Sequence, residues 1–402
     1  MLDPSTPQMW EIAIVGGCGH VGLPLGIAFA TRGANVVLVD RADDKVALVN
    51  SGKLPFMESG ADEPLARLIG DRIVASSDPR VVANSKVVIV VIGTPVDEHQ
   101  NPEPHKVIDA IEALVPYLRD HHLLVLRSTI YPGTTALVEK LLERNSLAID
   151  VAFCPERIAE GKAMVELFKL PQIVSARNDR AIQRSSELFG RLTEQIVVLS
   201  PEEAELAKLF TNTWRYIRFA TANQLFMMAQ DFGVSYERIR RGISEGYPRA
   251  KDLPGAGYTA GPCLLKDTLQ LAAFNNNDFV LGQAAISVNE GFPLYVVSQM
   301  ERRFEKLSEL TVGLLGMAFK GESDDTRSSL SYKIKRILRY RAGAVLCTDP
   351  YVTSDKELYP LDTVLERSDV LVIGAPHEVY AELTTQLPIV DVWCLRGEES
   401  GL

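Results

Sequence analysis

The sequence predicts an α/β protein in three parts: a doubly wound α/β domain, a central helical domain with one long helix, and a smaller α/β domain. Strands and helices alternate over the first 200 residues, which is typical of a parallel sheet covered by helices. A run from Pro201 then keeps helical spacing for about 30 residues, well above the mean helix length. From Leu310 the alternation returns in weaker form. We therefore expect domains at 1–200, 201–305 and 306–402.

The elements of the first part follow from local pattern. EIAIVGG is a short apolar run, a glycine turn follows it, LPLGIAFATRG is helical and NVVLVD is again strand-like. Later strands are expected at RIVASSD, SKVVIVVIGTP, HLLVLRSTI, AIDVAFCPE and QIVVLS. This order predicts repeated βα units that build one parallel sheet.

The second and third parts have their own signals. The long helix starts at Pro-Glu-Glu, a favourable first turn, and meets no glycine before Gly233. Shorter helices are expected up to about residue 305. The last part reads TVGLLGMAFK (strand), SLSYKIKRILRY (helix), AVLCTDP and SDVLVIGAP (strands). VIGTP (91–95) and VIGAP (372–376) both end strands, so the third part is expected to be a relative of the first.

Composition excludes several functions. A net charge of −10 over 402 residues argues against a nucleic-acid partner, because phosphate backbones require clustered Lys and Arg. The apolar runs are too short to span a bilayer and the N-terminus shows no signal peptide, so we expect no membrane association and a cytoplasmic protein. The five cysteines are widely spaced with no CxxC pair, which predicts neither a disulfide nor a metal site.

Glycines mark a dinucleotide site in the first part. Gly17, Gly19 and Gly22 form GxGxxG between a strand and a helix, and Asp40 ends the next strand 18 residues after Gly22. Such glycines permit a tight turn and close approach of a pyrophosphate to the helix N-terminus. The pattern predicts a Rossmann domain. Asp40 would bind the adenosine ribose and repel a 2′-phosphate, which favours NAD over NADP, although Arg41 beside it leaves NADP open. The cofactor site is also expected to include His20, Val21, Thr94 and Thr129.

Polar residues elsewhere are candidates for the chemistry. Lys208 and Asn212 lie one turn apart on the long helix and would bind an anionic or carbonyl oxygen; a solvated helix surface is the alternative. Glu156 and Glu160 follow a strand end, where open α/β sheets place ligands, although a surface loop would look the same. Thr129 ends another strand, where its hydroxyl would position a water.

Cys263 stands in the loop segment GPCLLKD. If a helix begins near Leu264, the thiol lies at a helix N-terminus, which favours the thiolate, and Lys266 adds positive charge. Asp267, one turn later, would act as a base or orient one. A nucleophilic thiol requires such surroundings, whereas an inert loop thiol is the alternative.

Seven segments together carry a resemblance. GTPVDE, STIYPGTT, CPERIAEGKA, ELAKLFTN, GPCLLKD, FKGESDDTR and DPY follow the glycine loop in one order along nearly the whole chain. With these motifs the chain closely resembles the UDP-glucose/GDP-mannose dehydrogenase family. The resemblance implies oxidation of a sugar C6 alcohol to a carboxylate with two NAD⁺, a homodimer built on the long helix, and a C-terminal domain that grips the nucleotide.

The resemblance also implies catalytic roles. Cys263 would be the nucleophile that captures the C6 aldehyde as a thiohemiacetal, which is then oxidised to a thioester. Lys208 and Asn212 would stabilise the oxyanion of each tetrahedral species. Asp267, with Thr129 and an ordered water, would handle protons.

Substrate contacts are implied for further residues. Glu160 would assist the acid–base steps, with Glu156 and Arg157 lining the site, while Lys320 and Arg327 would contact the nucleotide sugar. AGPCLLKD keeps the Lys-Asp of the members that act on UDP-glucose, whereas CPERIAEGKAMVEL resembles those that act on acetamido sugars. We expect a UDP-N-acetylhexosamine (UDP-ManNAc or UDP-GlcNAc), with UDP-glucose as the alternative. A two-electron hydroxyacid dehydrogenase and a non-catalytic NAD-dependent sensor remain rival hypotheses.

Overall fold

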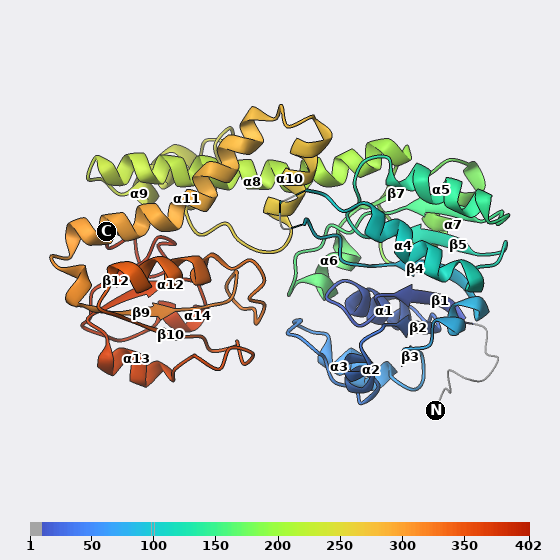
Figure 1. The fold of residues 1–402 in the computed structure, drawn as a ribbon, viewed down its shortest axis with the longest axis horizontal. Helices are drawn as coiled ribbons and strands as arrows, with labels where there is room; N and C mark the ends of the chain where they lie inside the picture. The colour runs from blue at the N-terminus through green and yellow to red at the C-terminus, as the bar shows by residue number, and fades with distance from the viewer. Residues whose placement is uncertain (1–9, 98, 100) are drawn as a thin grey trace. The chain divides into compact units, whose positions relative to one another are not determined.

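The computed structural model describes residues 10–97, 99 and 101–402. Glu98, the last residue of the GTPVDE motif, lies outside the described residues. The chain divides into two compact units, one up to Phe210 and one from Thr211 to Leu402. Each contains a β-sheet with helices, so the predicted α/β class is confirmed (Figure 1).

The first unit contains an eight-stranded sheet in the order β3-β2-β1-β4-β5-β6-β7-β8. Its strands are β1 (Trp10–Val15), β2 (Val36–Val39), β3 (Ile73–Ser76), β4 (Ser85–Val90), β5 (Leu123–Leu126), β6 (Asp150–Phe153), β7 (Gln172–Ala176) and β8 (Ile196–Leu199). Its helices are α1 (Gly22–Thr31), α2 (Asp43–Asn50), α3 (Asp62–Leu68), α4 (His105–Leu114), α5 (Thr134–Arg144), α6 (Ala163–Lys169) and α7 (Asp179–Gly190), with 3₁₀ turns η1 (Pro79–Asn84) and η2 (Val115–Tyr117).

One strand orientation departs from the predicted parallel sheet. The pairs from β3 through β6 are parallel, but β6 and β7 pair antiparallel, with Ala152 opposite Ala176. A parallel neighbour requires a crossover back to the opposite edge of the sheet. The segment 154–171, which contains only the short α6, does not make that crossover, so β7 starts at the edge where β6 ends.

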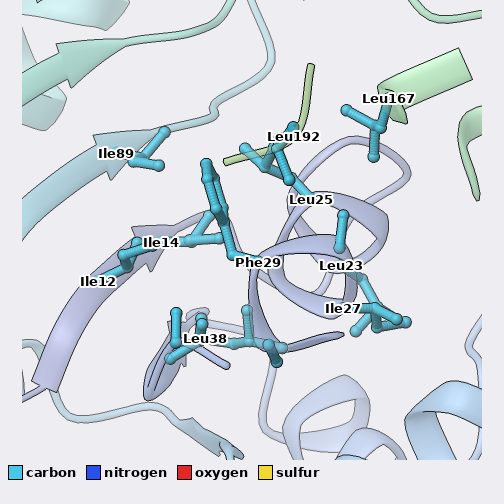
Figure 2. Close-up of a cluster of buried hydrophobic side chains, with 14 of the residues drawn as sticks. Ile12, Ile14, Leu23, Leu25, Ile27, Phe29, Leu38, Ile89, Leu167 and Leu192 are labelled. Atoms are coloured by element: carbon cyan, nitrogen blue, oxygen red, sulfur yellow. The ribbon is translucent and has the colours of Figure 1, made fainter. Parts of the chain in front are cut away.

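The core of the first unit lies on both faces of this sheet. On one face Ile14 of β1 and Leu38 of β2 meet α1, whose Leu25 and Phe29 are fully buried. Figure 2 shows these side chains packed together, with Leu192 beside them. Helix α1 is apolar along nearly its whole length, which is why it is buried almost all round. This packing holds the glycine loop between β1 and α1 in place.

Helix α8 (Pro201–Asp231) is the predicted long helix, with 31 residues. The second unit continues with α9 (Tyr236–Ser244), α10 (Leu264–Phe274), α11 (Val280–Arg303), η3 (Leu307–Glu309), β9 (Thr311–Leu315), α12 (Leu330–Arg341), β10 (Ala344–Thr348), α13 (Leu361–Arg367), β11 (Val370–Ile373), α14 (Glu378–Ala381) and β12 (Ile389–Val390). The last strand has only two residues and no periodic signal, and sequence reasoning missed it.

The second sheet has the order β10-β9-β11-β12, and all its pairs are parallel. This order repeats β2-β1-β4-β5 of the first unit, strand for strand. The similar segments VIGTP and VIGAP therefore follow corresponding strands, β4 and β11. Within residues 10–97, 99 and 101–402, no helix has both the length and the apolarity needed to cross a bilayer.

Candidate active site

The glycine loop lies between β1 and α1, with Val21 at the N-cap of the helix. A Cβ on Gly17 would stand 2.6 Å from the Ile14 carbonyl oxygen, and one on Gly22 would stand 2.5 Å from that of Gly16. Both positions require glycine for the fold itself. Gly16, which sequence reasoning missed, is the most restricted: its φ is +77° and a Cβ would lie 1.7 Å from the Val91 oxygen.

Gly19 is different, because a Cβ there would meet only the Gly16 oxygen, at 3.5 Å. That is an ordinary van der Waals distance, so packing within the protein does not demand glycine at this position. A missing side chain at the start of a helix leaves room for a ligand to approach the backbone N–H groups. The loop therefore fits the pyrophosphate of a dinucleotide.

Asp40 follows β2 and is half-buried, whereas its neighbour Arg41 is exposed. Its Oδ2 accepts the Cys18 N–H at 3.1 Å and its Oδ1 accepts the Ala42 N–H at 3.2 Å. A carboxylate offers about four lone pairs, so acceptor capacity remains for the hydroxyls of a ribose. The carboxylate is thus both fixed in direction and open to a ligand.

Two other predicted residues lie near the glycine loop. The ring of His20 packs on Phe56 with centroids 4.0 Å apart, and its Nδ1 lies 3.8 Å from Glu160 Oε1. Glu160 thus faces the glycine loop. At the ends of β4 and β5, the Thr94 hydroxyl donates to the Thr129 carbonyl oxygen at 2.7 Å, which joins these two loops.

Glu156 forms a buried ion pair that sequence reasoning missed. Its Oε2 accepts from Arg127 Nη2 at 2.6 Å and from Nε at 3.1 Å, while Arg127 is fully buried. Its Oε1 accepts the backbone N–H groups of Arg157 and Ile158. Both oxygens are therefore engaged within the protein. The side chain of Arg157 is partly buried and donates to the Pro171 carbonyl.

Glu205 is a second residue that sequence reasoning missed. It is 1% exposed on α8, and it accepts from the Gly133 N–H at 2.6 Å and from the N–H and hydroxyl of Thr135 at 2.9 and 2.6 Å. A carboxylate is favoured there because it faces the N-terminus of α5. The contact fixes the loop that runs from Thr129 to α5. The sequence did offer one indication of this residue: Glu205 lies one helical turn before Lys208, so both are expected on the same face of α8.

Lys208 and Asn212 are both buried on α8, so the alternative of a solvated helix face is wrong. The Asn212 amide donates to Asp267 Oδ2 at 2.6 Å. Asp267 is 0% exposed, and its Oδ1 accepts from Lys266 Nζ at 2.5 Å. The Lys266 ammonium is thus paired with the Asp267 carboxylate.

Cys263 is the exposed cysteine of the described chain and directly precedes α10, as the sequence predicted. Its carbonyl oxygen accepts the Asp267 N–H at 2.9 Å, so one helical turn joins the thiol residue to the buried carboxylate. The preceding loop is closely packed, because a Cβ on Gly261, whose φ is +101°, would stand 2.7 Å from the Phe319 ring. An accessible thiol at a helix start is placed for nucleophilic chemistry.

Lys320 and Arg327 lie in the segment between β9 and α12. The Lys320 ammonium lies 5.6 Å from the centre of the Phe319 ring. The Arg327 guanidinium binds the Asp325 carboxylate, with Nε–Oδ2 at 2.8 Å, while its side chain remains about half exposed. Two cations thus stand on one segment at the strand ends of the second sheet, where open α/β sheets bind ligands.

These features define an α/β oxidoreductase with a dinucleotide site. The sequence matches the NAD binding domain of the UDP-glucose/GDP-mannose dehydrogenase family over residues 10–193, its central domain over 202–291 and its UDP binding domain over 313–395. The UDP-N-acetyl-D-mannosamine dehydrogenase of Pyrococcus horikoshii is 31% identical over 380 residues, which cover 91% of this chain and 89% of the relative. The chain belongs to the UDP-glucose/GDP-mannose dehydrogenase family and is an NAD-dependent nucleotide-sugar dehydrogenase.

Solved structures agree with this assignment. A UDP-glucose dehydrogenase from Pyrobaculum islandicum superposes with a TM-score of 0.88 at 27% identity, covering 100% of this chain and 96% of the other. The UDP-D-ManNAc dehydrogenase of Pyrococcus horikoshii superposes with a TM-score of 0.87 at 28% identity, covering 93% of this chain and 91% of the other. The predicted family and cofactor are therefore confirmed.

Proposed function

We propose that this enzyme oxidises the C6 alcohol of a UDP-N-acetylhexosamine to the uronate, with Cys263 as the nucleophile. The observation that carries the proposal is the arrangement in the second unit. An exposed thiol begins α10, and one turn later a fully buried carboxylate, Asp267, holds the Asn212 amide. This arrangement suits capture of an aldehyde next to an oriented hydrogen-bond donor.

The proposed reaction proceeds through a covalent bond to the Cys263 sulfur. The Cys263 thiolate attacks the C6 aldehyde carbon, a C–S bond forms, and the carbonyl oxygen becomes the oxygen of a thiohemiacetal. Loss of hydride from that carbon leaves a thioester, and attack of water on the thioester releases the carboxylate and the thiol. Before the thiolate attacks, the C6 alcohol loses a hydride and a proton to give the aldehyde, and the thiohemiacetal later loses its hydroxyl proton together with the second hydride. Two hydrides therefore leave each sugar, and a bound NAD⁺ would accept each of them.

Neighbouring residues would stabilise charge and move protons. Lys208 and the Asn212 amide would bind the oxyanion, and Asp267 would orient that amide. Thr129 and Glu160 would position the water and exchange its proton. We assign a structural role to Glu156: it holds the loop after β6 through its ion pair with Arg127, because both its carboxylate oxygens are already engaged.

The third part of the chain would hold the nucleotide. Lys320 and Arg327 supply positive charge in the region matched by the UDP binding domain, and a diphosphate carries the complementary charge. We keep the division into an NAD-binding part (1–200), a central helical part (201–305) and a nucleotide-sugar-binding part (306–402) as part of this proposal.

For the sugar, we favour the N-acetylhexosamine because the relative in Pyrococcus horikoshii and that in Escherichia coli K12, 29% identical, are both named UDP-N-acetyl-D-mannosamine dehydrogenases. UDP-glucose is the alternative, supported by the Pyrobaculum islandicum structure. Comparison of kcat/KM for UDP-ManNAc, UDP-GlcNAc and UDP-glucose decides between them. A higher value for UDP-glucose would overturn the preference for an acetamido sugar.

We also propose a homodimer built on α8, in the cytoplasm. Large apolar side chains on this helix are exposed in the single chain: Phe210 (53%), Trp214 (59%) and Met228 (61%). Such a row of exposed apolar residues is suited to a second copy. Light scattering at micromolar concentration tests the dimer. The cytoplasmic location is part of this proposal and rests on the wide spacing of the five cysteines, which is typical of proteins from a reducing compartment.

Cys263→Ser tests the chemistry. Because an unactivated hydroxyl is a far poorer nucleophile than a thiol, the variant should bind the UDP-sugar normally but fail to complete the oxidation. Single-turnover NADH yield measures this, with about two NADH per sugar expected of the wild type. Cys394→Ser is the matched control, since Cys394 is partly exposed but outside α10 and its loop. A Cys263→Ser enzyme with wild-type turnover would remove the thiol from the reaction, and one NADH per sugar in the wild type would favour a two-electron dehydrogenase.

A further inference from the structure

His377 is a buried polar residue that the proposed chemistry does not use. It follows the VIGAP segment at the end of β11, and it is 0% exposed. Its Nδ1 accepts the Glu322 N–H at 3.0 Å, and its Nε2 lies 3.2 Å from Asp349 Oδ2. Because Nδ1 accepts a backbone N–H, the neutral ring carries its proton on Nε2 and donates it to Asp349.

Asp349 stands at the end of β10, and its side chain is also fully buried. Besides His377, its Oδ2 accepts the N–H groups of Met317 at 2.6 Å and Ala318 at 3.0 Å. Its Oδ1 accepts the N–H groups of Tyr351 at 2.8 Å and Val352 at 3.0 Å. The carboxylate therefore joins the end of β10 to the start of the segment that follows β9.

The two side chains together hold both ends of a short stretch of backbone. Asp349 binds it at Met317 and Ala318, and His377 binds it at Glu322. Lys320 lies between these anchors. The backbone on both sides of Lys320 is therefore held by a buried pair that lies far along the chain.

The stretch has little freedom between the anchors. Glu322 has a φ of +51°, a conformation that a non-glycine residue keeps only where its surroundings impose it. Its carboxylate accepts from the Glu378 N–H at 2.8 Å and the Tyr351 hydroxyl at 2.7 Å. A Cβ on Gly321 would stand 2.3 Å from the Pro376 oxygen, so the stretch lies directly against the chain that carries His377.

We propose that His377 and Asp349 are positioning residues for nucleotide binding: they hold residues 317–322 so that Lys320 meets the nucleotide sugar. This inference rests on the proposed role of Lys320. Neither side chain has an assigned role in the thiol chemistry, so we expect the pair to act on affinity for the nucleotide more than on the rate of the bound complex. Ligand binding to Asp349 itself is excluded, because five donors already occupy its roughly four lone pairs.

Three substitutions dissect the pair. His377→Phe keeps a ring between Tyr351 and Tyr380, which pack edge-on against it, but removes both hydrogen bonds. His377→Gln places an amide N–H near Nε2 and retains the bond to Asp349, whereas His377→Asn places an oxygen near Nδ1 and retains the bond from Glu322. His105→Phe is the control, because His105 is an exposed histidine of the first unit.

The full-length enzyme is titrated with UDP as the probe, and kcat and KM are measured for the UDP-sugar and NAD⁺. His377→Phe should weaken UDP and raise the sugar KM roughly tenfold, the effect of losing one to two hydrogen bonds, with kcat and the NAD⁺ KM unchanged. The Gln and Asn variants should lie between wild type and Phe, and they carry the test if the Phe variant does not fold. Equal loss in kcat and in affinity for both ligands would mean a general structural role and overturn the proposal.

A double-mutant cycle with Lys320→Met separates this inference from the proposed function. If the pair acts through Lys320, His377→Asn should weaken UDP much less in the Lys320→Met enzyme than in the wild type. Additive losses would overturn the positioning role alone. If Lys320→Met leaves UDP affinity unchanged, the assignment of Lys320 fails and the inference fails with it, although the role of Cys263 is untouched.

Discussion

The sheets β2-β1-β4-β5 and β10-β9-β11-β12 share one topology, and each places an aspartate after its second strand in chain order. Asp40 is half-buried and accepts one backbone N–H on each oxygen. Asp349 is fully buried and accepts five donors. The carboxylate at this position thus keeps acceptor capacity in one region, whereas in the other the protein itself fills that capacity.

The difference shows that an acid at this strand end is not by itself a ribose site. Asp349 accepts from four backbone N–H groups where Asp40 accepts from two, and the residue that follows the neighbouring strand adds a fifth donor. After β11 the chain supplies His377, which faces Asp349 and completes its hydrogen bonds. When VIGTP is matched with VIGAP, the position of His377 is taken by Val96, whose side chain has no hydrogen-bond donor. We expect the second region to bind its nucleotide through the cations of residues 317–327.

The largest expected loss of stability comes from substituting the glycine that follows the first strand of each region. Gly16→Ala would bring a Cβ to 1.7 Å from the Val91 oxygen at a φ of +77°, whereas Gly316→Ala would bring one to 2.7 Å from Ala375 at +91°. Backbone atoms cannot yield, so Gly16→Ala should cost about 4 kcal/mol or more in free energy of unfolding and Gly316→Ala about 2–3 kcal/mol. Urea unfolding measures both. Gly190→Ala, with open space around it, is the control, and a smaller effect at Gly16 than at Gly316 would contradict the ranking.

The same substitution, Asp to Asn, should mainly lower stability at Asp349 and mainly weaken cofactor binding at Asp40. Asp349→Asn directs an amide N–H at backbone donors in a buried place, so it should lower the free energy of unfolding by about 3 kcal/mol. Asp40→Asn turns its amide nitrogen toward only one backbone donor at a half-buried place, so it should lower the free energy of unfolding by only about 1 kcal/mol. It should weaken NAD⁺ roughly tenfold, because a ribose acceptor loses its charge. It should weaken NADP⁺ less, since a repeller of the 2′-phosphate is also removed.

Calorimetric titration and urea unfolding of both variants check this contrast. Equal losses of affinity for NAD⁺ and NADP⁺ in Asp40→Asn would show that Asp40 does not contact the ribose. An Asp349→Asn variant as stable as wild type would show that the buried carboxylate is not needed as an anchor.

As the pH is lowered, the first region should lose stability at a higher pH than the second. Burial, with the His121 charge, lowers the pKa of His122 from 6.5 to about 4. Between pH 6.5 and pH 4 His122 is protonated in the unfolded chain but neutral in the folded chain. The free energy of unfolding therefore decreases as the pH is lowered, by about 2 kcal/mol at pH 5. Burial alone would raise the pKa of Asp349, but the hydrogen bonds from His377 and the backbone lower it to about 2. Its contribution is therefore complete above pH 3.8 and is lost only as pH falls toward 2.

Hydrogen exchange at pH 7 and pH 5, corrected for intrinsic rates, measures this order. Peptides from β4 and β5 should lose protection at pH 5, while those from β9–β11 should not. His122→Asn, which can still accept the Arg119 N–H, should remove the dependence. Earlier loss of protection in β9–β11 would contradict the assignment of the acid-sensitive group.

Much of the fold and part of the candidate site were predictable from the sequence. The glycine loop, the long helix, the start of α10 at Leu264 and the relation between the two α/β parts all appear as predicted. The antiparallel β7 and the two-residue β12 were missed, because strand direction depends on a crossover and so short a strand has no period. Arg127, Glu205 and His377 were missed because their partners lie far away along the chain.

What the sequence determined by itself is what local chemistry controls. Glycine at a tight turn, apolar spacing of 3.6 residues and the order of short motifs act over a few neighbouring residues, so they identify the family, the cofactor and the cysteine at the start of α10. Only the tertiary structure decided which acids remain available to a ligand. Asp40 and Asp349 stand at corresponding strand ends, and Glu156 and Glu160 stand in one loop. Asp349 and Glu156 are each engaged by a side chain 28 and 29 residues away along the chain, because a carboxylate accepts only a limited number of hydrogen bonds and distant neighbours supply the donors.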